Sequence, residues 1–146
     1  GELTITDERM TRFMITLEEA IELVWHAFSN MSGGEIYIKK IPSMNIVDIA
    51  KSVSESATHK IIGIRPGEKI HEQMIGTEDA LFTYEYDSYY KILPAIYDCF
   101  KNIEWIGDGK QVSEDFSYTS NNNIDWMKIS DLKLWIQNHK TIIGKF

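Results

Sequence analysis

The stretch that decides the fold is Ile64-Arg65-Pro66-Gly67-Glu68-Lys69-Ile70-His71-Glu72. Its Pro-Gly pair favours a type II turn, because Gly67 can adopt a positive φ without a Cβ clash. Arg65 and Glu68 then lie at the two ends of one tight turn. A planar guanidinium beside a carboxylate suits an anionic ligand that carries hydroxyl groups, such as a sugar nucleotide. The same residues also fit an ordinary surface ion pair on a loop.

The residues before this turn predict a βαβ unit. Residues 35–39 alternate as a short strand, and residues 45–53 have apolar side chains at helical spacing behind Asn45, a favourable N-cap residue. The isoleucine-rich residues 61–64 predict a second strand, which should run parallel to the first. The Pro-Gly turn would then follow the carboxyl end of a parallel strand, where open α/β sheets bind ligands.

Two β-hairpins are expected beside this unit. Residues 2–6 and 11–15 both alternate, and the short polar segment 7–9 between them fits a hairpin connection. Residues 81–93 also alternate and are rich in aromatic side chains, with a turn at residues 87–88. We expect these aromatic side chains to lie in the core or at a subunit interface.

Helical patterns account for much of the remaining chain. Thr16 and Glu19 form a capping box at the start of an amphipathic helix that extends to about residue 29. His26 lies outside the apolar stripe of this helix, and we assign it no function. The stripe itself is expected to face the core and contains Leu17, Ala20, Ile21, Val24 and Phe28.

Three further helical segments have weaker patterns. Residues 69–74 fit a single helical turn, and residues 94–106 have apolar side chains at helical spacing with polar flanks. Ser130 is expected to cap a last helix. The whole chain is therefore expected to be one α/β domain, with the βαβ unit and hairpins in residues 1–93 and a loop-and-helix region in residues 94–146.

Composition restricts the class of function. The chain has 146 residues, enough for one domain with a sizeable core, and a formal net charge of −7, which argues against a nucleic-acid partner. The single cysteine, Cys99, excludes an internal disulfide and favours a reducing compartment. No apolar run approaches the roughly 20 residues that span a bilayer. We therefore expect a cytoplasmic protein with no membrane partner.

We expect no complete catalytic centre within this chain. The sequence has no G-x-G-x-x-G after a strand and no G-x-x-x-x-G-K-[ST], the patterns that hold nucleotide phosphates. The Tyr-x-x-x-Lys pair of short-chain dehydrogenases is also expected to be missing. His71 and Glu72 invite a metal interpretation, but no second histidine lies at metal-ligand spacing, so we expect no metal site.

Five segments of the chain carry a family resemblance when they are taken together and in order. They resemble the C-terminal part of the inverting UDP-N-acetylglucosamine 4,6-dehydratases, extended short-chain dehydrogenase/reductases of bacterial surface-polysaccharide and flagellin-glycan biosynthesis. Residues 116–121 and the closing helix resemble that family less sharply, and Met14 stands where many relatives carry tryptophan. The segments are Met10-Thr11-Arg12-Phe13, Thr16-Leu17-Glu18-Glu19-Ala20, Gly34-Glu35-Ile36, Ile41-Pro42-Ser43-Met44 and the stretch 64–72.

The resemblance implies that this chain is the substrate-binding portion of a larger lyase. The Rossmann half, which binds NADP and carries the catalytic tyrosine and lysine, would lie upstream of Gly1, so the chain alone would be inactive and would need no cofactor. In the complete enzyme, C4 of the sugar is oxidised, water is eliminated across C5 and C6, and hydride returns to C6 with inversion at C5. The implied partners are a UDP-sugar, the Rossmann half and further copies of the full-length enzyme.

The resemblance also implies a set of substrate-binding residues. Arg12 and Arg65 match family positions that face the UDP, and two guanidinium groups would offset the diphosphate charge. Glu68 would accept hydrogen bonds from the ribose hydroxyls. Thr11 and His71 are neighbouring candidates for the same site.

Two other functions fit the same residues. The chain resembles part of a related nucleotide-sugar epimerase, whose catalytic residues would differ in the missing half. It also fits a sugar-nucleotide binding or assembly module that performs no redox chemistry. An upstream sequence with a glycine fingerprint and Tyr-x-x-x-Lys would exclude the binding module.

Overall fold

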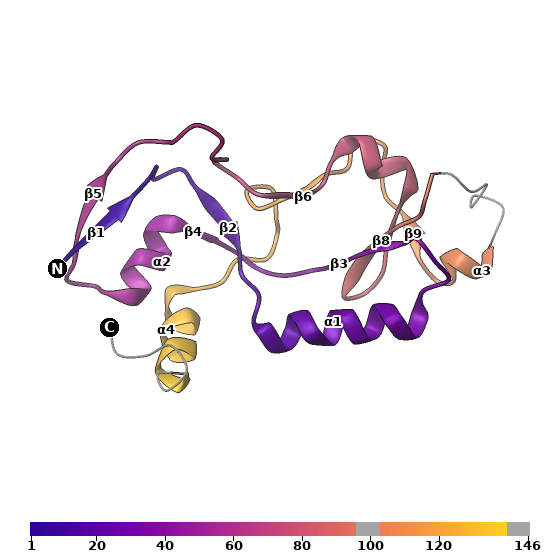
Figure 1. Cartoon of the computed structure of the whole chain (residues 1–146), viewed down its shortest axis with the longest axis horizontal. Helices are drawn as coiled ribbons and strands as arrows, with labels where there is room; N and C mark the ends of the chain where they lie inside the picture. The colour runs from indigo at the N-terminus through magenta and orange to yellow at the C-terminus, as the bar shows by residue number, and fades with distance from the viewer. Residues whose placement is uncertain (96–102, 140–146) are drawn as a thin grey trace. The chain divides into compact units, whose positions relative to one another are not determined.

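The computed structural model describes residues 1–95 and 103–139, which belong to two units interleaved along the chain (Figure 1). The first unit contains Gly1–Met14, Pro42–Glu72 and the C-terminal residues from Ser120 onward. The second contains Ile15–Ile41 and Gln73–Thr119. Each unit therefore draws on residues from both sides of residue 94. The mixed α/β class expected from the sequence is confirmed.

A parallel pair of strands precedes the Pro-Gly turn in the first unit. β1 (Glu2–Ile5) pairs with β5 (Thr58–Ile61), and Ile5 lies opposite Ile61. Between them in the sequence lies α2 (Ile46–Val53), which packs on β1 and begins where the Asn45 side chain accepts a hydrogen bond of 2.8 Å from Val47 N–H. The strand before the turn is thus parallel, as expected, but it ends at Ile61, so residues 62–64 of the expected strand lie outside it.

The partner of that parallel strand differs from the expected one. β3 (Ile36–Lys39) belongs to the second unit and pairs antiparallel with β8 (Tyr89–Ile92), so the βαβ unit built on residues 35–39 and 61–64 is wrong. Apolar alternation identifies a strand but does not identify its partner, because the partner depends on tertiary packing. Here β1 takes the place beside β5 that the sequence pattern gave to β3.

The expected N-terminal hairpin is also absent from the described residues. β2 (Thr11–Phe13) pairs antiparallel with β4 (Ser43–Asn45) and not with β1. The segment between β1 and β2 forms a local turn instead, in which the Asp7 carboxylate accepts hydrogen bonds from the Arg9 backbone and guanidinium. The short polar link therefore bends the chain without pairing its flanking strands.

The last helix closes the first unit. α4 (Ile129–Asn138) packs against α2, with Leu132 buried. Its N-cap residue is Lys128, so the expectation that Ser130 caps the helix is wrong; the Ser130 hydroxyl donates to the adjacent Asp131 carboxylate at 3.1 Å. The unit has a small core, formed by Ile5, Met10, Met44 and Leu132.

An antiparallel sheet forms the centre of the second unit, with strand order β3-β8-β7-β9. β7 (Thr83–Glu85) and β8 form the expected hairpin around residues 87–88, and β9 (Lys110–Gln111) pairs with the outer side of β7. Tyr84, Tyr90 and Ile92 are buried in this sheet. The expectation that the aromatic side chains lie in the core or at a subunit interface is thus confirmed for Tyr84 and Tyr90, which lie in the core, whereas Tyr86 and Tyr89 are half-buried.

Short elements complete the second unit. β6 (Gln73–Ile75) pairs with β10 (Tyr118–Thr119), and a 3-10 helix, η1 (Thr77–Phe82), follows β6. The helical turn expected at residues 69–74 does not form, because its last residues belong to β6. Within the helix expected at residues 94–106, only α3 (Ile103–Ile106) is seen, and residues 96–102 lie outside the described part of the chain.

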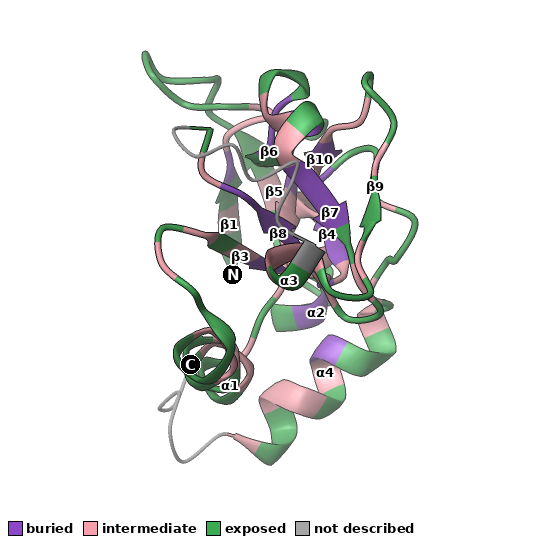
Figure 2. Ribbon diagram, turned by 90° about the vertical axis from the view of Figure 1, so that its right-hand side faces the viewer, coloured by how far each residue is buried: buried purple, intermediate pink, exposed green. Residues whose placement is uncertain are grey.

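α1 (Leu17–Asn30) has the expected capping box, because the Thr16 hydroxyl accepts from Glu19 N–H and the Glu19 carboxylate accepts from Thr16 N–H. The orientation of the helix differs from the expected one. None of its residues is buried (Figure 2). Most residues of the apolar stripe are exposed. Only Ala20 of the expected core-facing residues is half-buried.

Candidate functional site

The Pro-Gly turn forms as the sequence predicts. Glu68 N–H donates to the Arg65 carbonyl at 3.1 Å, and Gly67 has a φ of 87°, a conformation that glycine adopts without strain. The Glu68 carboxylate accepts a hydrogen bond of 2.9 Å from Arg65 N–H. The Glu68 side chain therefore stabilises the turn in which it lies. The Arg65 side chain is exposed, and its guanidinium has no hydrogen-bond or ion-pair partner among the described residues. It is therefore free to bind an anion.

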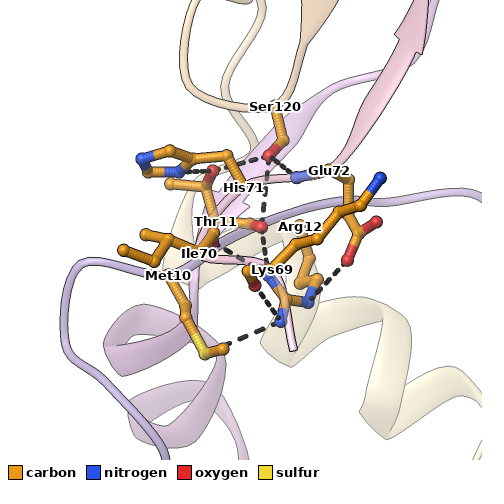
Figure 3. A network of polar contacts seen from close by, with 8 residues as sticks. All are labelled: Met10, Thr11, Arg12, Lys69, Ile70, His71, Glu72 and Ser120. Atoms are coloured by element: carbon orange, nitrogen blue, oxygen red, sulfur yellow. Dashed lines mark hydrogen bonds and ion pairs between the residues drawn. The ribbon is translucent and has the colours of Figure 1, made fainter. Parts of the chain in front are cut away.

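A hydrogen-bonded group of side chains lies where the segment after this turn meets β2 (Figure 3). The Thr11 hydroxyl lies 2.8 Å from His71 Nδ1 and 2.6 Å from the Ser120 hydroxyl. Thr11 and Ser120 are both buried, whereas His71 is half-buried. Thr11 thus links the two other side chains through its hydroxyl.

Ser120 connects three segments of the first unit through hydrogen bonds. Its hydroxyl donates to the Thr11 carbonyl at 3.1 Å and accepts from Glu72 N–H at 2.9 Å. Its backbone N–H donates to the Glu72 carbonyl at 2.8 Å. Ser120 was not among the residues predicted from the sequence. The one available signal was its place in residues 116–121, which resembled the dehydratases less sharply than the other segments.

Arg12 is held by backbone carbonyl groups. Its guanidinium donates to the carbonyls of Thr11 at 2.7 Å, Ile70 at 3.1 Å and Lys69 at 3.3 Å. It also forms an ion pair with Glu72, with 3.3 Å between Nε and Oε1. Arg12 therefore anchors the segment that follows the Pro-Gly turn. A bound diphosphate would have to share this guanidinium with its protein partners.

The structure divides the expected site residues into two groups. Thr11, Arg12 and His71 belong to the network around β2, whereas Arg65 and Glu68 form the turn at the start of the same segment. Within residues 1–95 and 103–139, no hydrogen bond or ion pair joins the two groups. The network thus fixes the end of a segment whose other end presents Arg65.

The described residues contain no cluster suited to a metal ion, since no group of three or more histidine, cysteine, aspartate or glutamate side chains converges. One sequence expectation needs correction. The spacing Tyr-x-x-x-Lys does occur, at Tyr97 and Lys101. Both residues lie outside the described part of the chain, and we assign this pair no catalytic role on its spacing alone.

Comparison with known proteins places the chain in a family. A family model described as "Polysaccharide biosynthesis protein" matches residues 1–94, which include the Pro-Gly turn, β2 and α1. The chain belongs to the polysaccharide biosynthesis protein family. The match ends before Tyr97, so the Tyr-x-x-x-Lys spacing lies beyond the matched region.

Relatives of this family member support the resemblance seen in the sequence. The chain is 48% identical over 143 residues to the UDP-N-acetylglucosamine 4,6-dehydratase (inverting) of Campylobacter jejuni, covering 94% of this chain and 42% of that protein. It is 38% identical over 95 residues to the UDP-glucose 4-epimerase of Rickettsia akari, covering 62% of this chain and 28% of that protein. The chain thus spans less than half of the length of these relatives.

A solved structure has the same fold over nearly the whole chain. The X-ray structure of Pen from Bacillus thuringiensis superposes with a TM-score of 0.76 and 26% sequence identity, covering 97% of this chain and 42% of that one. Among residues 1–95 and 103–139, no helix is both long and apolar enough to cross a membrane.

Proposed function

We propose that this chain is the sugar-nucleotide-binding portion of a UDP-N-acetylglucosamine 4,6-dehydratase that inverts C5, an enzyme of surface-polysaccharide or glycan biosynthesis. The observation that carries the proposal is the exposed Arg65 guanidinium, which has no partner among residues 1–95 and 103–139, on a turn stabilised by Glu68. The 48% identity to the Campylobacter jejuni dehydratase supports this substrate class. The complete enzyme is proposed to be a cytoplasmic homo-oligomer.

The side chains of the candidate site are suited to holding a nucleotide diphosphate. The Arg65 guanidinium would pair with a phosphate in the bidentate geometry that arginine favours. One carboxylate oxygen of Glu68 braces the turn, and the other is available to accept a hydrogen bond from a ribose hydroxyl. Thr11, Arg12 and His71 would then act chiefly by fixing the position of the segment that presents Arg65.

The chemical steps are proposed to belong to the part of the enzyme outside this chain. None of the described residues forms a glycine-rich phosphate cradle, so this chain does not fit NADP by itself. NADP, held by the remaining part, would supply reversible hydride acceptance for oxidation at C4 and reduction at C6, with loss of water between C5 and C6. By itself the chain is proposed to be inactive.

Two alternatives keep the same binding site. The 38% identity to the Rickettsia akari UDP-glucose 4-epimerase favours an epimerase portion as the second candidate. A non-catalytic sugar-nucleotide binding module is the third. The product of the full-length protein distinguishes them, because a dehydratase releases water, an epimerase gives an isomer of the same mass, and a binding module leaves the sugar unchanged.

The test of the binding site uses the full-length enzyme with Arg65→Ala. Loss of the guanidinium should raise the KM for UDP-N-acetylglucosamine at least tenfold, which corresponds to about 1.4 kcal/mol. Arg9→Ala is the matched control, because Arg9 is an exposed arginine of the same unit that forms its ion pair with nearby Asp7. Initial rates over a range of substrate concentrations measure both effects. A KM that stays the same in Arg65→Ala would remove Arg65 from the site.

A further inference from the structure

α1 is oriented with its apolar side toward solvent. Five large apolar side chains recur along this side of the helix and leave between about half and three quarters of their surface exposed. They are Leu17 at 72%, Ile21 at 48%, Val24 at 52%, Trp25 at 67% and Phe28 at 67%. We call these five residues the α1 stripe.

The opposite side of α1 packs within the second unit, although it is less apolar. Its half-buried residues include Leu23, His26 and Ala27. The His26 ring lies 5.8 Å from the Tyr37 ring and 4.7 Å from the Tyr89 ring. A helix that packs on one side and is strongly apolar on the other is typical of a helix buried between two layers. The second unit provides one of these two layers.

Exposed apolar side chains also occur directly before and after the helix. Ile15 precedes α1 and is 44% exposed, Met31 follows it and is 46% exposed, and Ile36 on β3 is 57% exposed. β3 is the outermost strand of its sheet, so one of its edges is unpaired within that sheet. A group of exposed, large apolar side chains of this kind marks an interaction site, because exposing apolar surface to water is unfavourable in free energy.

We propose that the α1 stripe is the docking surface for the part of the same enzyme that lies outside this chain. The inference rests on the proposed function. The chain covers only 42% of the Campylobacter jejuni dehydratase, so most of that protein has no counterpart here. The family match over residues 1–94 includes α1, so the helix belongs to the shared architecture. The part of the enzyme that lies outside this chain is therefore the partner that we assign to the α1 stripe.

Charge argues against a second copy of this chain as the occupant. α1 carries Glu18, Glu19 and Glu22 and has no lysine or arginine. A symmetric contact between two such helices would bring together two apolar stripes whose flanking charged residues on α1 are all acidic, which is unfavourable. Glu19 and Glu22 lie within 3.8 Å of Lys39, whereas Glu18 is exposed beside the stripe. The partner surface is thus apolar, with a basic residue near Glu18.

The test measures the accessibility of the stripe in the isolated chain and in a full-length chimera. In the chimera, this chain replaces the region of the Campylobacter jejuni dehydratase that it matches. Val24→Cys reports on the stripe, and Ser29→Cys is the control on an exposed residue of α1 outside it, both with Cys99→Ser. Maleimide labelling is followed by mass spectrometry of the α1 peptide. Val24→Cys should react at least tenfold more slowly in the chimera than in the isolated chain, and Ser29→Cys should react within twofold in both.

Three results would overturn the proposal. Equal labelling of Val24→Cys in both proteins would show that the remaining part leaves the stripe uncovered. Slow labelling in an isolated chain that sediments as a dimer would assign the stripe to a second copy, and slow labelling in a monomer would assign it to this chain itself. Phe28→Cys repeats the comparison if Val24→Cys does not fold. Labelling requires no UDP-sugar, so failure of the proposed function would leave this readout intact.

Discussion

Two arginines near the start of the chain show how the environment of a residue decides its function. Arg9 has a side chain that is 68% exposed and forms an ion pair with Asp7, two residues away. Arg12 has a side chain that is 28% exposed and binds carbonyls of β2 and of the segment after the Pro-Gly turn. Arg9 thus stabilises a local turn, whereas Arg12 joins segments that lie far apart in the sequence.

This contrast predicts different stability effects for the same substitution. Arg12→Met should lower the free energy of unfolding by about 1–3 kcal/mol, because partly buried carbonyls lose a charged donor. Arg9→Met should change it by less than about 0.5 kcal/mol, as is usual for an exposed ion pair. Urea unfolding followed by circular dichroism measures both. Equal effects would show that Arg12 does not anchor the segment.

A buried tyrosine of the second unit gives the fold a dependence on alkaline pH. Tyr90 packs against Phe116 and Tyr118, with ring centroids 5.1 and 5.2 Å apart. Burial raises the pKa of Tyr90 to about 12, with smaller contributions from Glu85 and Tyr118. In the unfolded chain a tyrosine ionises near about pH 10. Between these two pH values, the Tyr90 hydroxyl therefore keeps its proton in the folded state and loses it in the unfolded state.

The free energy of unfolding should consequently fall as the pH rises from about 10 to about 12. Tyr90→Phe should remove part of this fall, since phenylalanine has no proton to lose. Tyr37, Tyr86 and Tyr89 also have raised pKa values, so part of the fall remains in the variant. Urea unfolding at a series of pH values tests this expectation. An identical alkaline profile in Tyr90→Phe would contradict it.

At the scale of elements, local signals predict local structure well. The capping box of α1, the Pro-Gly turn at residues 65–68 and the β7–β8 hairpin all form as expected. Each depends on residues only a few positions apart, whose geometry allows few arrangements. The partners of β1, β2 and β3 were predicted wrongly, because strand pairing depends on tertiary contacts that alternation does not encode.

The same distinction explains how much of the candidate site the sequence predicts. Thr11, Arg12 and His71 were named as candidates, and the structure brings them into one network. Ser120 was missed, because a single serine in a polar segment has no spacing signal. The α1 stripe was identified as apolar, but its expected contact with the core was wrong. A helical period identifies an apolar side and does not say which surface covers it.

At the scale of the whole molecule, the interleaving of the two units makes the site depend on distant parts of the chain. The network of the first unit combines β2, residues 69–72 and Ser120, which are separated by long segments of the second unit. An acidic chain can still provide a local anion site, because the Arg65 guanidinium is exposed and its neighbour Glu68 is engaged with the backbone. Net charge therefore argues against a nucleic-acid partner but does not exclude binding of a single diphosphate.

The proposed division of the enzyme predicts which ligands the isolated chain binds. It should not bind NADP, because no glycine-rich turn between a strand and a helix is present in its sequence to hold the pyrophosphate. Isothermal titration calorimetry with NADP should therefore give no binding heat in the micromolar range. The chimera with the remaining part of the Campylobacter jejuni dehydratase is the positive control, since NADP should bind there. Micromolar binding of NADP by the isolated chain would contradict the division, because a dinucleotide site would then lie within the portion assigned to the sugar nucleotide.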